Sequence, residues 1–186
     1  MPKHAANQPV PKLGHHSSGF TLVELVITIA ILSITLLAVA KSLQFSLQFS
    51  ADSLWQSRSV ALANAYADEI MGQRYDQLSP GGGGSCAPCT APHALGRDGV
   101  EARGGATAEN SYNDVDDYIT DPEGELPRNA WGAERADYSG YRVIISVTYA
   151  GTDLGLSPQA AKKVAISIKP PAQTAAIPFV FYRTDL

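Results

Sequence analysis

One apolar segment constrains this chain more than any other feature. Residues 25–40 carry no charged side chain, and the stretch from Phe20 to Ala40 contains a single one, Glu24. At about 1.5 Å of rise per residue, a helix of this length extends roughly 31 Å, close to the thickness of the hydrocarbon core of a bilayer. The segment therefore predicts a transmembrane helix over residues 20–40 and argues against a purely cytosolic enzyme.

The residues before this segment form a polar leader, 1–19, with Lys3 and Lys12 and no acidic side chain. A basic segment before an apolar helix is expected to stay on the cytoplasmic side of a membrane. An ordinary secretory signal would be cut after the apolar region, and residues 38–40 could serve as that site. Against this alternative, the apolar region is long for a signal core. Glu24 would also cost about 2.5–3.5 kcal/mol at mid-bilayer.

The junction between leader and helix resembles the processing motif of type IV prepilins. Gly19 precedes the apolar residue Phe20, and Glu24 is the fifth residue after that junction. The resemblance implies that a prepilin peptidase cuts between Gly19 and Phe20 and methylates the new amino group of Phe20. It also implies that Glu24 pairs with the Phe20 ammonium of a neighbouring subunit, because a carboxylate in apolar surroundings needs a cation. The alternative is a plain signal anchor with Glu24 at the lipid headgroups.

The helix is expected to continue to residue 77, because the chain from Lys41 to Gln77 contains no proline and one glycine, Gly72. Heptads are not sustained, which argues against the alternative of a coiled-coil stalk, and Pro80 with the glycines after it ends the segment. The pattern predicts an amphipathic half that packs on a globular head. The apolar stripe consists of Leu43, Leu47, Leu54, Leu62, Tyr66 and Ile70, and the polar face of Ser46, Asp52, Ser59, Asp68 and Gln73.

Residues 78–140 are predicted to be loops with at most short elements, because they hold most of the glycines. Within them, Cys86 and Cys89 form a CxxC unit, and the oxidising compartment outside the inner membrane favours a disulfide between them. Two alternatives stay open. A thioredoxin-like redox site requires a CxxC at the start of a helix, and a zinc site would have only Cys86, Cys89 and His93 as ligands.

An acidic cluster follows in the sequence Asn113 to Tyr118, which contains Asp114, Asp116 and Asp117. Carboxylate oxygens can bind calcium, although this spacing does not match an EF-hand. We favour a solvated acidic turn in which the aspartates cap backbone N–H groups, with calcium binding as the alternative.

Beyond Gly140 the apolar residues alternate with a period of two, which predicts three strands: 141–149, 164–169 and 177–183. Pro178 suits an edge strand. Short links between the three segments favour an antiparallel meander, whose apolar face would cover the amphipathic half of the helix. The predicted fold class is therefore α+β.

A long helix (20–77) followed by a head (78–186), with its loops before its strands (141–186), is the architecture that the resemblance to type IV pilins implies. Four short segments further resemble the minor prepilins of mannose-sensitive haemagglutinin (MSHA) pili, D type. They are residues 63–70 (ANAYADEI), the CxxC, residues 112–118 (YNDVDDY) and residues 181–183 (FYR). In addition, Lys41 stands where major pilins of this family commonly have a proline, which weakens assignment as the bulk subunit.

The resemblance implies a structural subunit that is stored in the bacterial inner membrane, with its leader cytoplasmic and its head periplasmic. It would then be assembled into a pilus, at or near the tip. The implied partners are other pilins, contacted through the helix, the prepilin peptidase and the inner-membrane assembly platform. A minor pseudopilin of a type II secretion system, in a periplasmic pseudopilus, is the alternative because it shares the processing signal. A tip adhesin or a DNA-uptake pilin is the third possibility.

The composition favours neither an enzyme nor a nucleic-acid-binding protein. His93 is the one histidine after the leader, no set of nucleophile, base and oxyanion donors emerges, and no cofactor is expected. Removal of Lys3 and Lys12 with the leader leaves 12 basic and 18 acidic residues, a net charge of −6 that disfavours DNA. Carbohydrate binding would require exposed aromatic residues such as Trp131 and Tyr138 on one surface.

Overall fold

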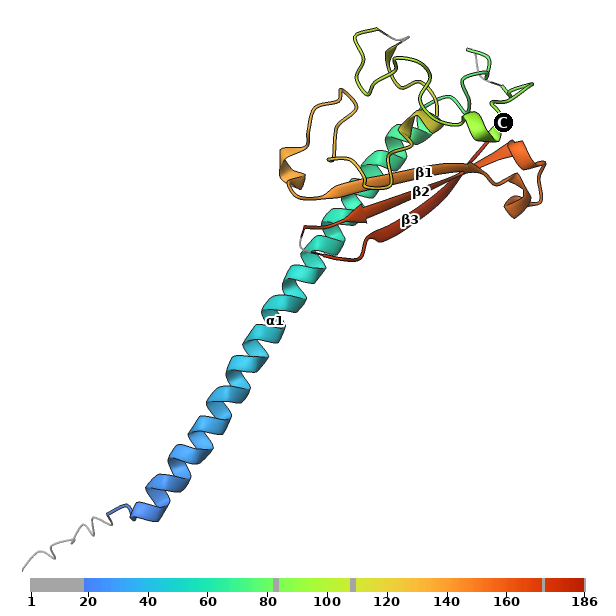
Figure 1. Cartoon of the computed structure of the whole chain (residues 1–186). Helices are drawn as coiled ribbons and strands as arrows, with labels where there is room; N and C mark the ends of the chain where they lie inside the picture. The colour runs from blue at the N-terminus through green and yellow to red at the C-terminus, as the bar shows by residue number, and fades with distance from the viewer. Residues whose placement is uncertain (1–18, 82–83, 108–109, 172, 186) are drawn as a thin grey trace, which may run out of the picture. The chain divides into compact units, whose positions relative to one another are not determined.

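The computed structural model describes residues 19–81, 84–107, 110–171 and 173–185, so the predicted leader up to residue 18 lies outside the described residues. The chain divides into two compact units at Ser50. Helix α1 (Leu22–Met71) forms the described first unit and opens the second, which also contains strands β1 (Arg142–Tyr149), β2 (Ala161–Lys169) and β3 (Ile177–Thr184) (Figure 1). The predicted α+β class is confirmed.

In the first unit, α1 begins at Leu22, directly after the capping residue Thr21. The backbone N–H of Glu24 donates to Thr21 Oγ1 at 3.3 Å, and the Leu25 N–H donates to the Thr21 carbonyl at 3.1 Å. Every residue from Phe20 to Ser50 is exposed, and an 18-residue window of the helix reaches a mean hydropathy of 2.6. Length and composition suffice to cross a membrane, although a signal sequence has the same properties.

In the second unit, α1 buries one stripe of side chains, as the sequence pattern predicts for Leu62, Tyr66 and Ile70. Leu54, which the same pattern assigns to the stripe, is 54% exposed. The assignment of Ser59 to the polar face is wrong, because Ser59 is completely buried. It lies one turn before Leu62 and therefore shares the face that packs on the head.

The helix ends at Met71, so its predicted extension to Gln77 is wrong. Gly72 follows, and glycine is a poor helix former because it loses the most backbone entropy on folding. From Arg74 onward the backbone pairs with a loop far along the chain, and the Arg74 N–H donates to the Asn113 carbonyl at 3.2 Å. Contacts with this distant loop therefore replace the last predicted turns of the helix.

The three strands form an antiparallel meander in the order β1-β2-β3, as predicted. Their core positions are in register, with Ile145 opposite Ile166 and Ile166 opposite Phe179. The side chains of Ile145, Ile166 and Phe179 pack with the buried stripe of α1 in one hydrophobic core. Strand β2 begins at Ala161, earlier than the predicted residue 164, because the ladder extends to Lys162 and Ala161.

The segment before the sheet is irregular, as predicted, with short 3₁₀ helices at Pro92–Ala94, Asp116–Tyr118 and Ala136–Tyr138. Part of it lies along the outer edge of β1. There the backbones of Glu125 and Val143 exchange two hydrogen bonds of 2.9 Å. The loops are thus anchored to the sheet by backbone pairing.

Candidate functional site

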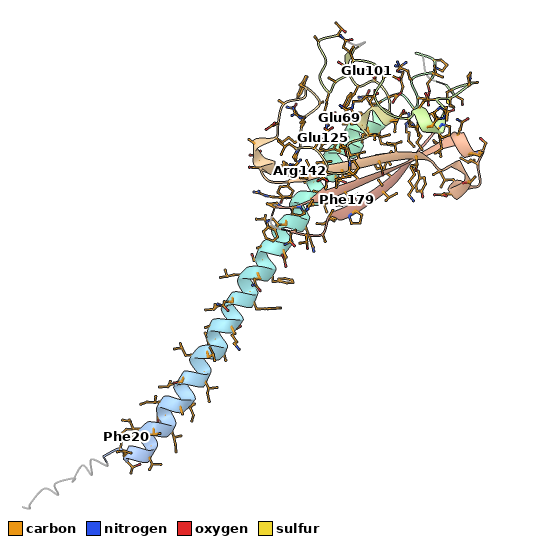
Figure 2. All side chains as sticks on the ribbon, in the orientation of Figure 1. Phe20, Glu69, Glu101, Glu125, Arg142 and Phe179 are labelled. Atoms are coloured by element: carbon orange, nitrogen blue, oxygen red, sulfur yellow. A yellow bond between two sulfur atoms is a disulfide. The ribbon has the colours of Figure 1, made fainter. Side chains whose placement is uncertain are left out.

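The predicted processing site lies at the start of the described chain. Among the described residues, none beyond the chain neighbours of Gly19 places an atom within 4 Å of where its side chain would begin, and Phe20 is 79% exposed (Figure 2). The described part of the chain therefore does not cover this junction. That a peptidase cuts there and methylates Phe20 stays a prediction.

Glu24 is exposed in the first turn of α1. A carboxylate at this end of a helix interacts favourably with the unpaired N–H groups and the helix dipole. Because the hydrogen bond to Thr21 comes from the backbone of Glu24, it leaves the carboxylate available to a partner. The pairing of Glu24 with another subunit stays a prediction.

In the head, one fully buried charge was not predicted from the sequence: the ammonium of Lys162. Its Nζ donates to the Tyr75 carbonyl at 2.7 Å and to Asp76 Oδ2 at 3.0 Å, and it contacts the carboxylate of Asp116. The same Nζ lies 4.8 Å from the ring centroid of Tyr75 and 5.5 Å from that of Tyr149. Three acceptors and two aromatic rings together compensate the burial of this charge.

A sequence signal for Lys162 existed. Lys162 has the same parity along β2 as the core residues Val164, Ile166 and Ile168, so the alternation already pointed it inward. A charged residue at an inward position predicts a buried partner of opposite charge.

Asp76 is one of the two carboxylate partners of this ammonium. Burial raises its pKa, but hydrogen bonds from Thr90, from the Leu78 N–H and from Lys162 outweigh that effect and lower the pKa to about 2. The Tyr149 hydroxyl donates to the same carboxylate at 2.9 Å. Asp76 thus connects the end of the helical region, the loop at Thr90 and the sheet.

The acidic cluster is buried, so the prediction of a solvated turn is wrong. Its capping role is confirmed: Asp114 Oδ1 accepts the N–H groups of Asp116 at 2.8 Å and Asp117 at 3.2 Å. Asp117 Oδ2 accepts those of Asn113 at 2.7 Å and Asp114 at 3.0 Å. Burial, and then the charges of Asp116 and Asp117, raise the pKa of Asp114 to about 8. Calcium binding by the three aspartates stays a prediction, which now requires the ion to compete with Lys162.

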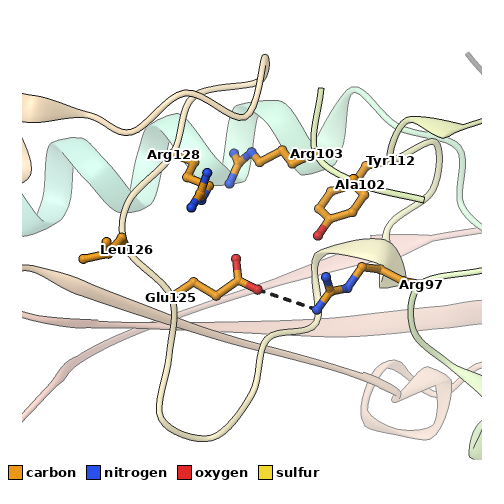
Figure 3. A pocket seen from close by; sticks show the side chains of 7 residues that line it. All are labelled: Arg97, Ala102, Arg103, Tyr112, Glu125, Leu126 and Arg128. Carbon is orange, nitrogen blue, oxygen red and sulfur yellow. Dashed lines mark ion pairs between the residues drawn. The ribbon is translucent and has the colours of Figure 1, made fainter. Parts of the chain in front are cut away.

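A cavity of about 420 Å³ opens in the head beside the acidic cluster's loop. Three arginines from separate loop positions, Arg97, Arg103 and Arg128, line it together with Tyr112 and Glu125 (Figure 3). No feature of the sequence brought these residues together, because their proximity depends on how the loops fold.

The two aromatic residues named for carbohydrate binding have different environments. Trp131 is 81% exposed. Tyr138 is half-buried and packs edge-on against Tyr141, with ring centroids 5.5 Å apart. Tyr138 therefore contributes to packing.

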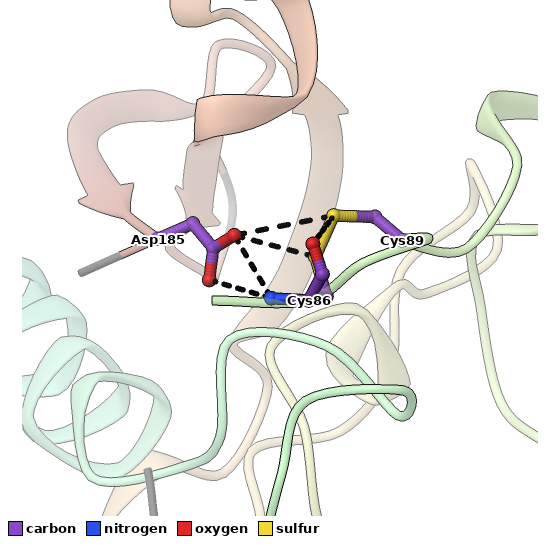
Figure 4. Close-up of side chains that lie close together, drawn as sticks. All are labelled: Cys86, Cys89 and Asp185. Atoms are coloured by element: carbon purple, nitrogen blue, oxygen red, sulfur yellow. Dashed lines mark hydrogen bonds between the residues drawn. A yellow bond between two sulfur atoms is a disulfide. The ribbon is translucent and has the colours of Figure 1, made fainter. Parts of the chain in front are cut away.

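Cys86 and Cys89 form a disulfide, in agreement with the favoured interpretation (Figure 4). The Cys86 N–H donates to the Asp185 carboxylate at 3.1 Å, so the bridge is joined to the residue after β3. The zinc alternative requires His93 beside the two sulfurs. The carboxylate of Asp185 lies there instead. His93 is exposed in a short 3₁₀ helix, and the CxxC does not begin an α-helix as a thioredoxin-like site requires.

Comparison with known proteins identifies one matching family model. Residues 14–40 match the family described as "Prokaryotic N-terminal methylation motif". No curated protein and no solved structure matches the chain. The matched region contains Gly19, Phe20, Glu24 and the apolar helix, and it supports a prepilin-processed protein of the type IV pilin superfamily. It points to a structural subunit rather than an enzyme, and with the apolar helix it suggests membrane anchoring.

Proposed function

We propose that this protein is a minor type IV pilin of the MSHA type, assembled at or near the tip of a pilus. The observation that carries the proposal is the placement of Glu24. It is the one charge between Phe20 and Ala40, it lies in the first helical turn, and it belongs to the matched region, residues 14–40.

In this proposal, the exposed first unit has different surroundings before and after assembly. Before assembly, lipid surrounds the apolar side chains of residues 22–40, all of which the isolated chain leaves uncovered. After assembly, the helices of other subunits surround them. The Phe20 ammonium of one subunit then neutralises Glu24 of the next, which fixes their axial register because an unpaired carboxylate in apolar surroundings is costly.

The proposed partners are the prepilin peptidase, the inner-membrane assembly platform and other pilins. The protein moves from the inner membrane to the extracellular filament when it is assembled. The four short segments that resemble MSHA minor prepilins of the D type support the pilus. A minor pseudopilin of a type II secretion system is the competing candidate, supported by the same processing motif. The net charge of −6 without the leader gives the DNA-uptake function no support.

Deletion of the gene, followed by complementation, separates the two candidates. The proposal predicts fewer surface pili in the deletion strain, normal secretion through the type II pathway, and the protein in the sheared pilus fraction by immunoblotting. A secretion defect with normal pilus number would instead establish the pseudopilin. Genes for pilus assembly next to this gene would support the pilus, and genes for secretion would oppose it.

A further inference from the structure

The arginine-lined cavity has a fixed frame. Glu125 is mounted on the edge of the sheet by its two backbone hydrogen bonds with Val143. The segments of Arg103 and Arg128 are packed backbone against backbone, because Gly104 abuts Trp131 and Gly132 abuts the Arg103 carbonyl, where side chains would not fit. The cavity walls are therefore set by the fold and not by mobile side chains alone.

The three arginines differ in how firmly they are held. Arg103 is 7% exposed, and its Nε and Nη2 donate to the two oxygens of Glu69 at 3.1 and 2.5 Å. Arg128 donates to the Gly132 carbonyl at 2.8 Å, and its nearest carboxylate, Glu134, is 3.5 Å away and 59% exposed. This exposed pair contributes little.

Arg97 is held most weakly. Its one ion pair among the described residues is with Glu125 at 3.7 Å, longer than a hydrogen bond, and the two side chains are 42% and 34% exposed. Its guanidinium lies 6.0 Å from the centre of the Tyr112 ring. Three arginines and one carboxylate, Glu125, line the cavity, and Arg103 is paired with Glu69 outside the lining. Counted over the lining residues and this pair, the cavity retains one positive charge, which Arg97 and Arg128 share.

We propose that this cavity binds a carboxylate-bearing sugar of the uronic acid class. One excess positive charge matches one carboxylate, and planar guanidinium groups are the best protein partners for it. Arg97 and Arg128 supply that contact, since Arg103 is already committed to Glu69. The volume of about 420 Å³ exceeds what a carboxylate alone needs and accommodates a sugar ring.

Two further residues favour a sugar over an acidic peptide. Glu125 lies across the cavity from Arg103 and Arg128 (Figure 3) and offers acceptor oxygens, which sugar hydroxyls use and an acidic side chain does not. Tyr112 adds an aromatic ring that is half-buried and packed edge-on against Tyr118, with centroids 5.0 Å apart. The proposal concerns the head alone and is independent of whether the protein enters a pilus.

Isothermal titration calorimetry of the mature full chain in detergent at low salt tests the proposal. The probes are trigalacturonic acid, the neutral trisaccharide galactotriose and triglutamic acid. We expect trigalacturonic acid to bind and galactotriose to give no heat of binding. Triglutamic acid should bind at least about tenfold more weakly than trigalacturonic acid. Equal binding of galactotriose, tighter binding of triglutamic acid, or no binding of trigalacturonic acid would each overturn the proposal.

Variants locate the site. Arg97→Gln and Arg128→Gln should each weaken trigalacturonic acid binding about tenfold, the usual effect of losing a hydrogen bond to a charged group. Arg58→Gln, which removes the same charge from the exposed surface of α1, should leave it unchanged. Arg97 makes no hydrogen bond to the described backbone, so Arg97→Gln should fold normally even if Arg128→Gln does not. An unchanged affinity in a folded Arg97→Gln protein would place the ligand elsewhere.

Discussion

The ammonium of Lys162 lies 3.0 Å from the carboxylate of Asp76, and both side chains are completely buried. This pair joins strand β2 to the segment that follows α1, and Asp116 adds the loop region to it. One cation therefore holds three parts of the head together. The irregular segment before the sheet is therefore joined to strand β2 through Asp116 and Lys162.

Replacing Lys162 should destabilise the head strongly. Lys162→Met leaves Asp76 and Asp116 buried without their cation, and removal of one partner from a buried ion pair costs about 3–5 kcal/mol. The free energy of unfolding, measured with urea in detergent, checks this. Lys163→Met is the matched control, because Lys163 is half-buried on the opposite face of β2 and its loss should cost under about 1 kcal/mol. Similar losses for both variants would contradict the role of the buried cation.

The raised pKa of Asp114 predicts a pH dependence of stability. Its folded pKa of about 8 exceeds the ordinary value of 3.8, so between these values the folded state binds more protons than the unfolded state. Stability therefore falls as pH rises through this window. Asp116, Asp117 and Lys162 are the charged groups that act on it.

Asp114→Asn should remove much of that fall. Asparagine keeps the Oδ1 atom that accepts the N–H groups of Asp116 and Asp117 but cannot ionise. At pH 9 the variant should melt several degrees above the unmodified protein, at roughly 2–4 °C per kcal/mol, and the difference should shrink as pH falls and vanish below the ordinary pKa of 3.8. The exposed Asp121→Asn is the control. A variant that melts lower at pH 9 would show that the charged form of Asp114 stabilises the head.

The disulfide should contribute modestly. Its loop of four residues gives about 2 kcal/mol in the chain-entropy model, and the Cys86 N–H contact with Asp185 does not need the sulfurs. Cys86→Ser with Cys89→Ser should lower the free energy of unfolding by about that amount while the near-ultraviolet circular dichroism spectrum is kept. Loss of the folded spectrum would mean that the bridge carries the fold.

The sequence predicts the fold class and the three strands, but it does not predict the polar contacts inside the head. Period-two alternation located the three strands, because side-chain direction in a strand depends on local geometry alone. The end of α1 could not be located, since Arg74 leaves the helix to pair with Asn113, a residue far along the chain. The acidic cluster looked solvated for the same reason. The cluster contacts Lys162, a residue far away in the sequence, through Asp116, and a local pattern of aspartates cannot reveal such a partner.

Glu24 should be needed for assembly and not for processing. Glu24→Val keeps the backbone N–H that donates to Thr21, so the start of α1 should be unchanged, but it removes the carboxylate that the neighbouring Phe20 ammonium requires. The amount of the variant in sheared pili, relative to the membrane fraction, should fall severalfold. Thr28→Val, one turn further along the helix, should assemble normally. Equal incorporation of both variants would remove the registry role of Glu24.

Mass spectrometry of the mature chain identifies its first residue, and Gly19→Val, which should retain the leader, is the companion variant. We expect a mature protein of 167 residues that begins with N-methyl-phenylalanine at Phe20. A mature chain that begins after Ala40, as an ordinary secretory signal would produce, would contradict this expectation.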